Sequence, residues 1–284
     1  MKRFVWLLVA PMLVSPLRAA DLMQIYRDAQ ASDATYAAAR STLEAGRERM
    51  PQARAGLLPT LSLTANSFWN QNELYLRGSG NRTNADFNSN GYTLTLSQPL
   101  FRWQNWVAYD QSKFQVAQAE ANFVQAGQDL ILRVAQAYFD VLYANENLKA
   151  VRANKVSIEQ QLESAKRNFE VGTSTIVDAQ EAQARFDLAT AQEIAAESDL
   201  EVRQRALEAI IGKEPGALAP LRRDAEIPQP QPADMKKWAA AAESDNITVQ
   251  IQMAALEIAS REVDRQRAGH YPTVDVVANK GKST

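Results

Sequence analysis

Residues 103–170 read WQNWVAYDQSKFQVAQAEANFVQAGQDLILRVAQAYFDVLYANENLKAVRANKVSIEQQLESAKRNFE, with no proline and one glycine, Gly127. Apolar residues recur in this segment at a spacing of seven. One row is Phe123, Leu130, Ala137, Ala144, Val151, Ile158 and Ala165. A second row is Val134, Val141, Leu148, Lys155, Leu162 and Phe169. Heptad spacing predicts one long helix packed against other helices, and at 1.5 Å per residue it would be about 100 Å long.

A return helix is predicted for residues 176–211, after a turn at Val171–Ser174 in which Gly172 takes the left-handed conformation that ends a helix. Its apolar residues form rows on opposite sides, so it should have neighbours on both sides. Small alanines in these rows permit close approach. The two segments therefore predict an antiparallel helical hairpin that is one stave of a closed ring of helices.

Composition excludes several classes of protein. The chain has 284 residues, 46% hydrophobic and 23% charged, with a net charge of -2. A nucleic-acid-binding protein would show a basic face, and a disordered chain would lack this apolar content. The absence of cysteine excludes a disulfide scaffold, a thiolate metal site and a lipid-modified N-terminal cysteine.

The first twenty residues have the pattern of a secretory signal peptide. Lys2 and Arg3 precede an apolar run at 4–14, and the small residues Ala19 and Ala20 follow. After this segment no apolar run approaches the roughly 20 residues of a membrane-spanning helix. If the mature protein enters a membrane, we expect it to do so as β-strands.

Alternation replaces helical spacing after Pro59. Leu61, Leu63 and Ala65 alternate with polar residues, as do Tyr92, Leu94 and Leu96, and a polar loop is predicted at 78–90. Two strands of about ten residues, apolar on one face, are typical of a transmembrane barrel hairpin. A soluble hairpin with one wet face fits the alternation equally well. The signal peptide and the lack of another anchor favour the barrel.

The sequence repeats internally at an offset of 213 residues. Seven of the thirteen positions in 54–66 are identical to those in 267–279, including Pro59 and Pro272. Upstream, the pair Ser32-Asp33 corresponds to Ser244-Asp245 with one residue of slippage. The repeated unit is a helix pair, a proline junction and a strand. Its second copy is incomplete, and we expect a chain truncated at its C-terminus.

Five motifs resemble the TolC-like outer-membrane factors, the exit ducts of bacterial efflux and type I secretion systems. They occur in order over residues 21–279. They are Leu22-Met23-Gln24-Ile25-Tyr26, the proline junctions, Ser97-Gln98-Pro99-Leu100-Phe101, Ala137-Tyr138-Phe139-Asp140-Val141-Leu142, and Phe169-Glu170-Val171-Gly172 followed by Asp178. The lack of an N-terminal cysteine resembles the unacylated, secretion-associated branch.

The resemblance implies a homotrimer in the outer membrane, with a periplasmic extension. Each protomer contributes strands to one β-barrel, in contact with outer-membrane lipid, and helices to one periplasmic tunnel. The implied partners are a periplasmic adaptor (membrane fusion) protein and an inner-membrane ABC or proton-driven transporter. No cofactor and no nucleic acid are expected. The chain departs from the family in length, because it holds one of two helical hairpins and about one and a half of two strand pairs.

These observations predict a mostly α-helical fold with a transmembrane β-hairpin and seven consecutive segments. They are a signal peptide (1–20), periplasmic helices (21–57), the outer-membrane β-hairpin (58–101), the long helical hairpin (102–212), a proline-rich connector (213–233), the helices of the second copy (234–270) and its truncated strand (271–284).

Each candidate functional residue has a functional and a purely structural interpretation. The position of Asp178, three residues after Thr175, predicts a capping box at the start of the return helix. The resemblance implies that Asp178 also makes a contact at the closed entrance of the tunnel. Val171, Gly172 and Thr173 form a tip that family members present to the adaptor, or a simple helix-ending turn.

The proline and aromatic candidates lie around the strands. Helix–strand junctions are assigned to Pro59, Pro99 and Pro272, which we interpret as structural. Membrane-interface aromatics are assigned to Trp69, Tyr75 and Tyr92, with ordinary packing between strands as the alternative.

The function predicted from these features is a passive export duct for multidrug efflux or type I protein secretion, without catalysis of its own. A secreted coiled-coil structural or adhesive protein is the alternative. A further possibility, which qualifies the prediction of an export duct, is that the chain is an inactive truncated duct fragment. A hydrolase lacks support, because no nucleophile and base are grouped around the single histidine, His270.

Overall fold

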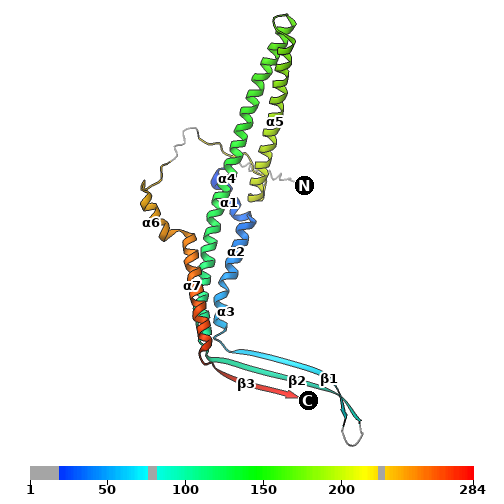
Figure 1. Cartoon of the computed structure of the whole chain (residues 1–284), viewed down its shortest axis with the longest axis vertical. Coiled ribbons are helices and arrows are strands. Elements are labelled where there is room, and N and C mark those ends of the chain that lie inside the picture. The colour runs from blue at the N-terminus through cyan, green and yellow to red at the C-terminus, as the bar shows by residue number, and fades with distance from the viewer. Residues whose placement is uncertain (1–18, 76–81, 223–227) are drawn as a thin grey trace, which may run out of the picture. The chain divides into compact units, whose positions relative to one another are not determined.

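A computed structural model describes residues 19–75, 82–222 and 228–284, without the side chains of residues 74, 75, 82 and 83. The predicted signal peptide lies outside this description except for Ala19 and Ala20. The elements are α1 (Leu22–Ser32), α2 (Ala34–Arg47), α3 (Arg49–Ala55), β1 (Thr60–Tyr75), β2 (Arg82–Phe101), α4 (Trp103–Glu170), α5 (Ile176–Ile211), α6 (Met235–Asp245), α7 (Ile247–Arg267), the 3₁₀ helix η1 (Ala268–His270) and β3 (Val274–Ser283) (Figure 1). The predicted fold class, mostly helical with antiparallel strands, is confirmed.

The chain divides into two compact units, which are described separately. Unit 1 comprises Met1–Ala37 and Gly127–Gln229, and unit 2 comprises Ala38–Ala126 and Pro230–Thr284. None of the helices in the described ranges carries an apolar segment of the length that crossing a membrane requires.

Unit 1 contains α5 and the part of α4 from Gly127 onward, which form the helical hairpin, and the bounds of both helices are those expected from the sequence. Its core includes α1 as a third helix. The buried apolar residues of this core are Ile25, Ala29, Leu130, Val134, Tyr138, Val141, Leu142, Leu207 and Ile211. Both heptad rows of α4 contribute to it, so the predicted packing of the long helix is confirmed.

Tyr138 of α4 contacts two segments of unit 1 that lie outside its helices, the chain before α1 and the connector after α5. Its hydroxyl donates a hydrogen bond to the Ala219 carbonyl at 2.8 Å. Next to that carbonyl, Ala20 and Leu218 form a parallel bridge, in which the Ala20 N–H donates to Ala217 and the Ala219 N–H donates to Ala20. The buried tyrosine ring is thus covered by the start of the described chain and by the connector after α5.

Asp33 ends α1 and begins α2. Its N–H donates to the Ala29 carbonyl at 2.8 Å, and its carboxylate accepts the Tyr36 N–H at 2.6 Å. The Arg133 guanidinium of α4 donates to both carboxylate oxygens at 2.9 Å, and only 5% of the Asp33 side chain is exposed. Bidentate charge-assisted bonds of this kind are strong, so one carboxylate fixes the break between two helices to a third.

The internal repeat is present in the structure at a constant offset of 213 residues. Helices α1 and α6 have the same length and begin after the caps Asp21 and Asp234. Asp33, with φ -64° and ψ 118°, corresponds to Asn246, with φ -67° and ψ 121°, and each ends one helix and caps the next. The one-residue slippage predicted upstream is therefore wrong: the backbone equivalent of Asp33 is Asn246, because both residues perform the same two capping functions.

Helix α7 of unit 2 is joined to the first part of α4 by polar contacts. The Gln111 amide donates to the Ile258 carbonyl at 3.0 Å and to Glu262 at 3.2 Å. Arg265, Gln266 and Gln111 together lower the pKa of Glu262 to about 2. On α2, a Cβ at Gly46 would lie 2.6 Å from the Ala119 side chain, so glycine is what allows α2 and α4 to approach there.

The sheet of unit 2 has the order β1-β2-β3, so the strands of the two repeat copies flank β2 (Figure 1). Strand β1 has 16 residues and β2 has 20, longer than the ten expected. The predicted polar loop at 78–90 is wrong from residue 82 onward, where the chain is part of β2. Its polar side chains pair across the strands instead, as Asn70 does with Ser89 at 2.8 Å.

The two faces of the sheet differ in polarity. Paired residues share a face, and Leu63 pairs with Leu94, which pairs with Lys280. What we call the apolar face carries Leu61, Leu63, Ala65, Tyr92, Leu94, Leu96, Val274, Val276 and Ala278. The opposite face, which we call the polar face, carries mostly polar residues: Ser62, Thr64, Asn66, Thr93, Thr95, Ser97 and Asn279, together with Phe68, Phe87 and Val277.

Pro99 differs in position from the two other prolines. Pro59 lies directly before β1 and Pro272 two residues before β3, as predicted for junctions. Pro99 lies inside β2, where the pairing with β3 is irregular between Pro99 and Phe101. A proline has no N–H to donate, so the strand accommodates it at a bulge and the junction falls at Arg102.

Replacing Arg133 with methionine should lower the free energy of unfolding by about 1–3 kcal/mol, because the buried Asp33 carboxylate would lose its cation. Arg185→Met is the matched control, since Arg185 pairs with Glu181 on an exposed helix face. Urea unfolding followed by circular dichroism measures both. Equal effects of the two substitutions would contradict the assignment.

The effect of Arg133→Met should also depend on pH. Hydrogen bonds from Arg133 are the main cause of the lowered pKa of Asp33. The pair therefore stabilises the fold fully above pH 3.8, and this contribution is lost as the pH falls further and Asp33 is protonated. The difference between the variant and the wild type should shrink over that acid range.

Candidate functional site

The tip of the hairpin is a tight turn held by backbone hydrogen bonds. The Gly172 N–H donates to Phe169 at 3.0 Å and the Thr173 N–H to Asn168 at 2.8 Å. Gly172 has φ +76°, the left-handed conformation predicted for it. A Cβ at this glycine would meet nothing within 4 Å, so backbone conformation rather than crowding requires glycine here.

Asp178 and Thr175 form the predicted capping box at the start of α5. The Asp178 N–H donates to the Thr175 hydroxyl at 3.3 Å, and the Thr175 N–H donates to the Asp178 carboxylate at 2.8 Å. Hydrogen bonds that the Thr175 N–H and then the Thr175 hydroxyl donate to this carboxylate lower the pKa of Asp178. The carboxylate also lines a hollow of about 150 Å³ together with Ile158, Gln161, Glu181, Ala182 and Arg185. The cap interpretation is confirmed, and the entrance contact stays a prediction.

The tip presents apolar side chains to solvent. Val171 is 73% exposed and Val177 67%, and Ile176 between them in the turn is half exposed. Gly172 and Thr173 are also exposed. Sequence analysis missed Ile176 and Val177, although two apolar residues directly after the polar turn were a visible signal. The turn and the start of α5 therefore offer a small apolar surface next to backbone hydrogen bonds that hold the turn.

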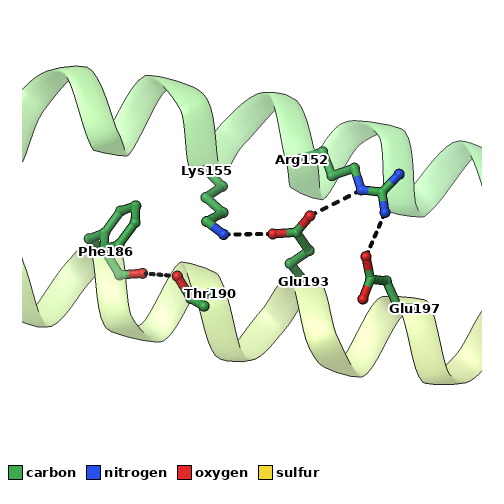
Figure 2. A network of polar contacts seen from close by, with 6 residues as sticks. All are labelled: Arg152, Lys155, Phe186, Thr190, Glu193 and Glu197. Atoms are coloured by element: carbon green, nitrogen blue, oxygen red, sulfur yellow. Dashed lines mark hydrogen bonds and ion pairs between the residues drawn. The ribbon is translucent and has the colours of Figure 1, made fainter.

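A four-residue charge network joins the two helices of the hairpin. The Lys155 ammonium of α4 donates to Glu193 of α5 at 2.8 Å, and Arg152 donates to Glu193 at 3.0 Å and also to Glu197. Figure 2 shows both cations pointing from α4 toward α5, with Phe186 beside Lys155. The ammonium lies 5.5 Å from the centre of the Phe186 ring.

This network explains the lysine that interrupts the second heptad row. Val134, Val141, Leu148 and Leu162 of that row are buried, and the Lys155 side chain is three-quarters buried among them. Hydrogen bonds from Lys155, and then from Arg152, lower the pKa of Glu193. A lysine at one seam position can fix the register of two helices that alanines alone would leave free to slide.

The aromatic candidates occupy the sheet. Trp69 is 79% exposed, Tyr92 is half exposed, and the pairing places both on the apolar face. Tyr75 is the last residue of β1, and its side chain lies outside the described residues. Sequence analysis missed three further exposed aromatics next to the junctions, Trp103, Trp106 and Tyr271.

The described residues hold no group of three or more histidine, aspartate or glutamate side chains that could bind a metal ion. The candidate positions thus fall into two sets. One is the hairpin tip of unit 1, and the other is the sheet of unit 2 with its junctions.

The sequence profile of the family described as outer membrane efflux protein matches residues 25–213, more than half of the chain. The chain belongs to the outer membrane efflux protein family. This membership places it among the proteins of the bacterial outer membrane and confirms the resemblance derived from the five motifs.

Two curated relatives of this family member are similar over nearly its whole length. The outer membrane protein TolC of Vibrio cholerae is 32% identical, over 96% of this chain and 61% of the relative. The alkaline protease secretion protein AprF of Pseudomonas aeruginosa is 33% identical, over 93% of this chain and 56% of the relative. The chain therefore spans about 60% of the length of these relatives.

The fold is shared with solved structures of channels. The CmeC outer membrane channel of Campylobacter jejuni superimposes with a TM-score of 0.71 at 16% sequence identity, over 93% of this chain and 61% of that one. At this identity the likeness concerns the fold.

Replacing Gly172 with alanine should destabilise the tip by about 1–2 kcal/mol, the cost of a left-handed conformation for an L-residue. Gly216→Ala is the control, because Gly216 also has open space around it but no positive φ. Hydrogen exchange of the amides at 168–178 measures the effect. Equal protection in both variants would show that the turn does not depend on glycine.

Replacing Glu193 with glutamine should lower the melting temperature more than the same change at Glu197. Glu193 accepts from both Lys155 and Arg152, whereas Glu197 accepts from Arg152 alone. Thermal melts followed by circular dichroism compare the two isosteric variants. A larger effect at Glu197 would contradict the central position of Glu193.

Proposed function

We propose that this chain is a subunit of a passive export duct in the bacterial outer membrane. The observation that carries the proposal is the sheet, whose apolar face is exposed while its other face is mostly polar. Leu61, Leu63, Val274 and Val276 on the apolar face are all at least half exposed. Such a sheet suits an environment with lipid on one side and water on the other.

The outer surface of the hairpin supports assembly with further helices. Several large apolar residues of α4 and α5 are mostly exposed although they lie on helices with a packed core, and five of the most exposed support this point. They are Leu132, Tyr143, Leu188, Ile194 and Val202. Apolar surface on both sides of a hairpin fits a ring of staves, which we propose is closed by copies of the chain in a homotrimer.

The duct itself would catalyse no reaction and bind no cofactor. Its energy would come from an inner-membrane ABC or proton-driven transporter, connected through a periplasmic adaptor protein. We assign adaptor contact to Val171, Gly172 and Thr173, together with the exposed Ile176 and Val177. Asp178 would add a contact at the entrance while keeping its role as a cap.

The remaining assignments concern the sheet. Pro59 and Pro272 would redirect the chain from helix to strand, and Pro99 would do so through its bulge. Trp69, Tyr75 and Tyr92 would lie at the membrane interface, where amphipathic rings are favoured. The cargo would be either small molecules or secreted protein, and relatives of both kinds of system share this family.

The alternative of a secreted coiled-coil adhesive protein has less support. A fibrous stalk needs the heptad rows of α4, but it needs neither a two-faced sheet nor a second copy of the helix–strand unit. Membership of the outer membrane efflux protein family also favours the duct.

Single cysteines test the proposal in a chain that has none of its own. Thr95→Cys and Leu96→Cys lie next to each other in β2 but on opposite faces of the sheet. In outer-membrane fractions of cells that express the chain, a charged maleimide should label Cys at 95 and leave Cys at 96 protected. Detergent should then expose both, which controls for folding.

The same fractions test the assembly. Chemical cross-linking should give trimers in the outer membrane. Recovery of the chain only as a soluble periplasmic monomer, with positions 95 and 96 labelled equally, would refute the duct.

A further inference from the structure

Two lysines interrupt the apolar face of the sheet. Lys280 pairs with Leu94, which pairs with Leu63, and Lys282 pairs with Tyr92, which pairs with Ala65. Strand β3 thus presents Val274, Val276 and Ala278 on this face and then two cations. The lysines are not on the polar face, where Asn279, Gly281 and Ser283 lie.

Neither lysine has an acidic partner among the described residues. Both side chains are exposed, and no ion pair or hydrogen bond of their ammonium groups is present there. The nearest carboxylate on the same face toward the β1–β2 turn is that of Asp86, which pairs with Gln71 and lies six residues along β2 from Tyr92. At 3.4 Å per residue that is about 20 Å, beyond the reach of a lysine side chain.

The position of the lysines along the strand matches the edge of an apolar band. Eight residues separate Val274 from Lys282, about 26 Å along the strand, or about 20 Å across a bilayer for a strand tilted by about 40°. The apolar band of outer-membrane strands is about 25 Å tall. Beyond Lys282 the same face becomes polar, with Asn90 and Ser67, and then carries Trp69.

We propose that Lys280 and Lys282 bind the phosphate of an anionic lipid headgroup, with Tyr92 beside it. The inference rests on the proposed function, because it requires that the apolar face contacts lipid. An unpaired ammonium in an apolar band extends its stem along the hydrocarbon and places its charge at the headgroup level. Two ammonium groups two residues apart on one strand face then meet one phosphate from the same side.

Close packing of β3 against β2 at Gly281 fixes the positions of these two lysines along the strand. A Cβ at Gly281 would lie 2.7 Å from the Tyr92 carbonyl oxygen and 2.8 Å from the Thr93 hydroxyl. Glycine therefore lets β3 approach β2 between the two lysines. The pair keeps its register opposite Leu94 and Tyr92 as a result.

Lysines on an edge strand also deter pairing with other strands. That role does not depend on which face carries the charge, whereas headgroup binding does. Moving both lysines three residues along β3, to positions 277 and 279, distinguishes the two, because it keeps their spacing and places both side chains on the opposite face.

The experiment compares three forms of this chain. They are the wild type, the variant Lys280→Gln/Lys282→Gln, and a face-swapped variant that adds Val277→Lys and Asn279→Lys to those two changes, which keeps the two lysines two residues apart on the opposite face. The face-swapped protein has the same net charge as the wild type. Each is reconstituted into vesicles of phosphatidylcholine alone and of phosphatidylcholine and phosphatidylglycerol in equal parts, and native mass spectrometry counts the phosphatidylglycerol that stays bound.

The wild type should retain phosphatidylglycerol over phosphatidylcholine, and the glutamine variant should lose about fivefold per lysine. The face-swapped variant should resemble the glutamine variant. Full recovery in the face-swapped protein, or equal retention by all three, would overturn the proposal.

The duct and the headgroup site can be refuted separately. If the wild type inserts, with position 96 protected, but shows no preference for phosphatidylglycerol, the headgroup site is wrong and the duct stands. If no variant inserts and position 96 is labelled, the proposed function fails and the headgroup site fails with it.

Discussion

The apolar seam between α4 and α5 is the constraint on which the hairpin depends. Heptad rows place large apolar residues of α4 against a helix whose facing residues, such as Ala189 and Ala196, are small and buried. Such a seam lets the two helices pack closely but does little to fix their register, because alanine side chains form few distinct holes for the side chains of the facing helix. The charge network around Glu193 supplies the register, and the capping box at Thr175 and Asp178 sets where the return helix begins. The exposed turn at the tip thus joins two helices whose register these contacts fix.

The repeat shows how one backbone plan serves two environments. Helices α1 and α6 are equivalent at an offset of 213, and Ile25 corresponds to Trp238. Ile25 is 2% exposed in the core of unit 1, whereas Trp238 is 51% exposed. Asp33 needs the Arg133 guanidinium because its carboxylate is buried, and its equivalent Asn246 performs both capping functions without a charge. The caps and breaks are common to both copies, and the side chains that face neighbours are not.

Local patterns in the sequence were enough to predict the bounds of α4 and α5, the left-handed glycine at 172 and the box at Asp178. Each depends on residues a few positions apart, whose physics is local. The strands were underestimated, because asparagines and serines at 82–90 resemble a loop until a partner strand satisfies them. Pro99 was misplaced for a related reason, since only the pairing with β3 shows that β2 continues past it. The pairs Arg133–Asp33 and Lys155–Glu193 join residues 100 and 38 positions apart, and no local pattern reveals them.

The constant offset between the copies has a consequence for the length of the chain. One added residue in a helix rotates everything after it by about 100°, and one added residue in a strand exchanges its faces. From Asp21 and Asp234 to Pro59 and Pro272, the two copies have diverged in most side chains without a net gain or loss of a residue. The number of residues between the helix cap and the strand is therefore what the two copies have kept. Insertions and deletions would change the faces that later residues present, whereas substitutions do not.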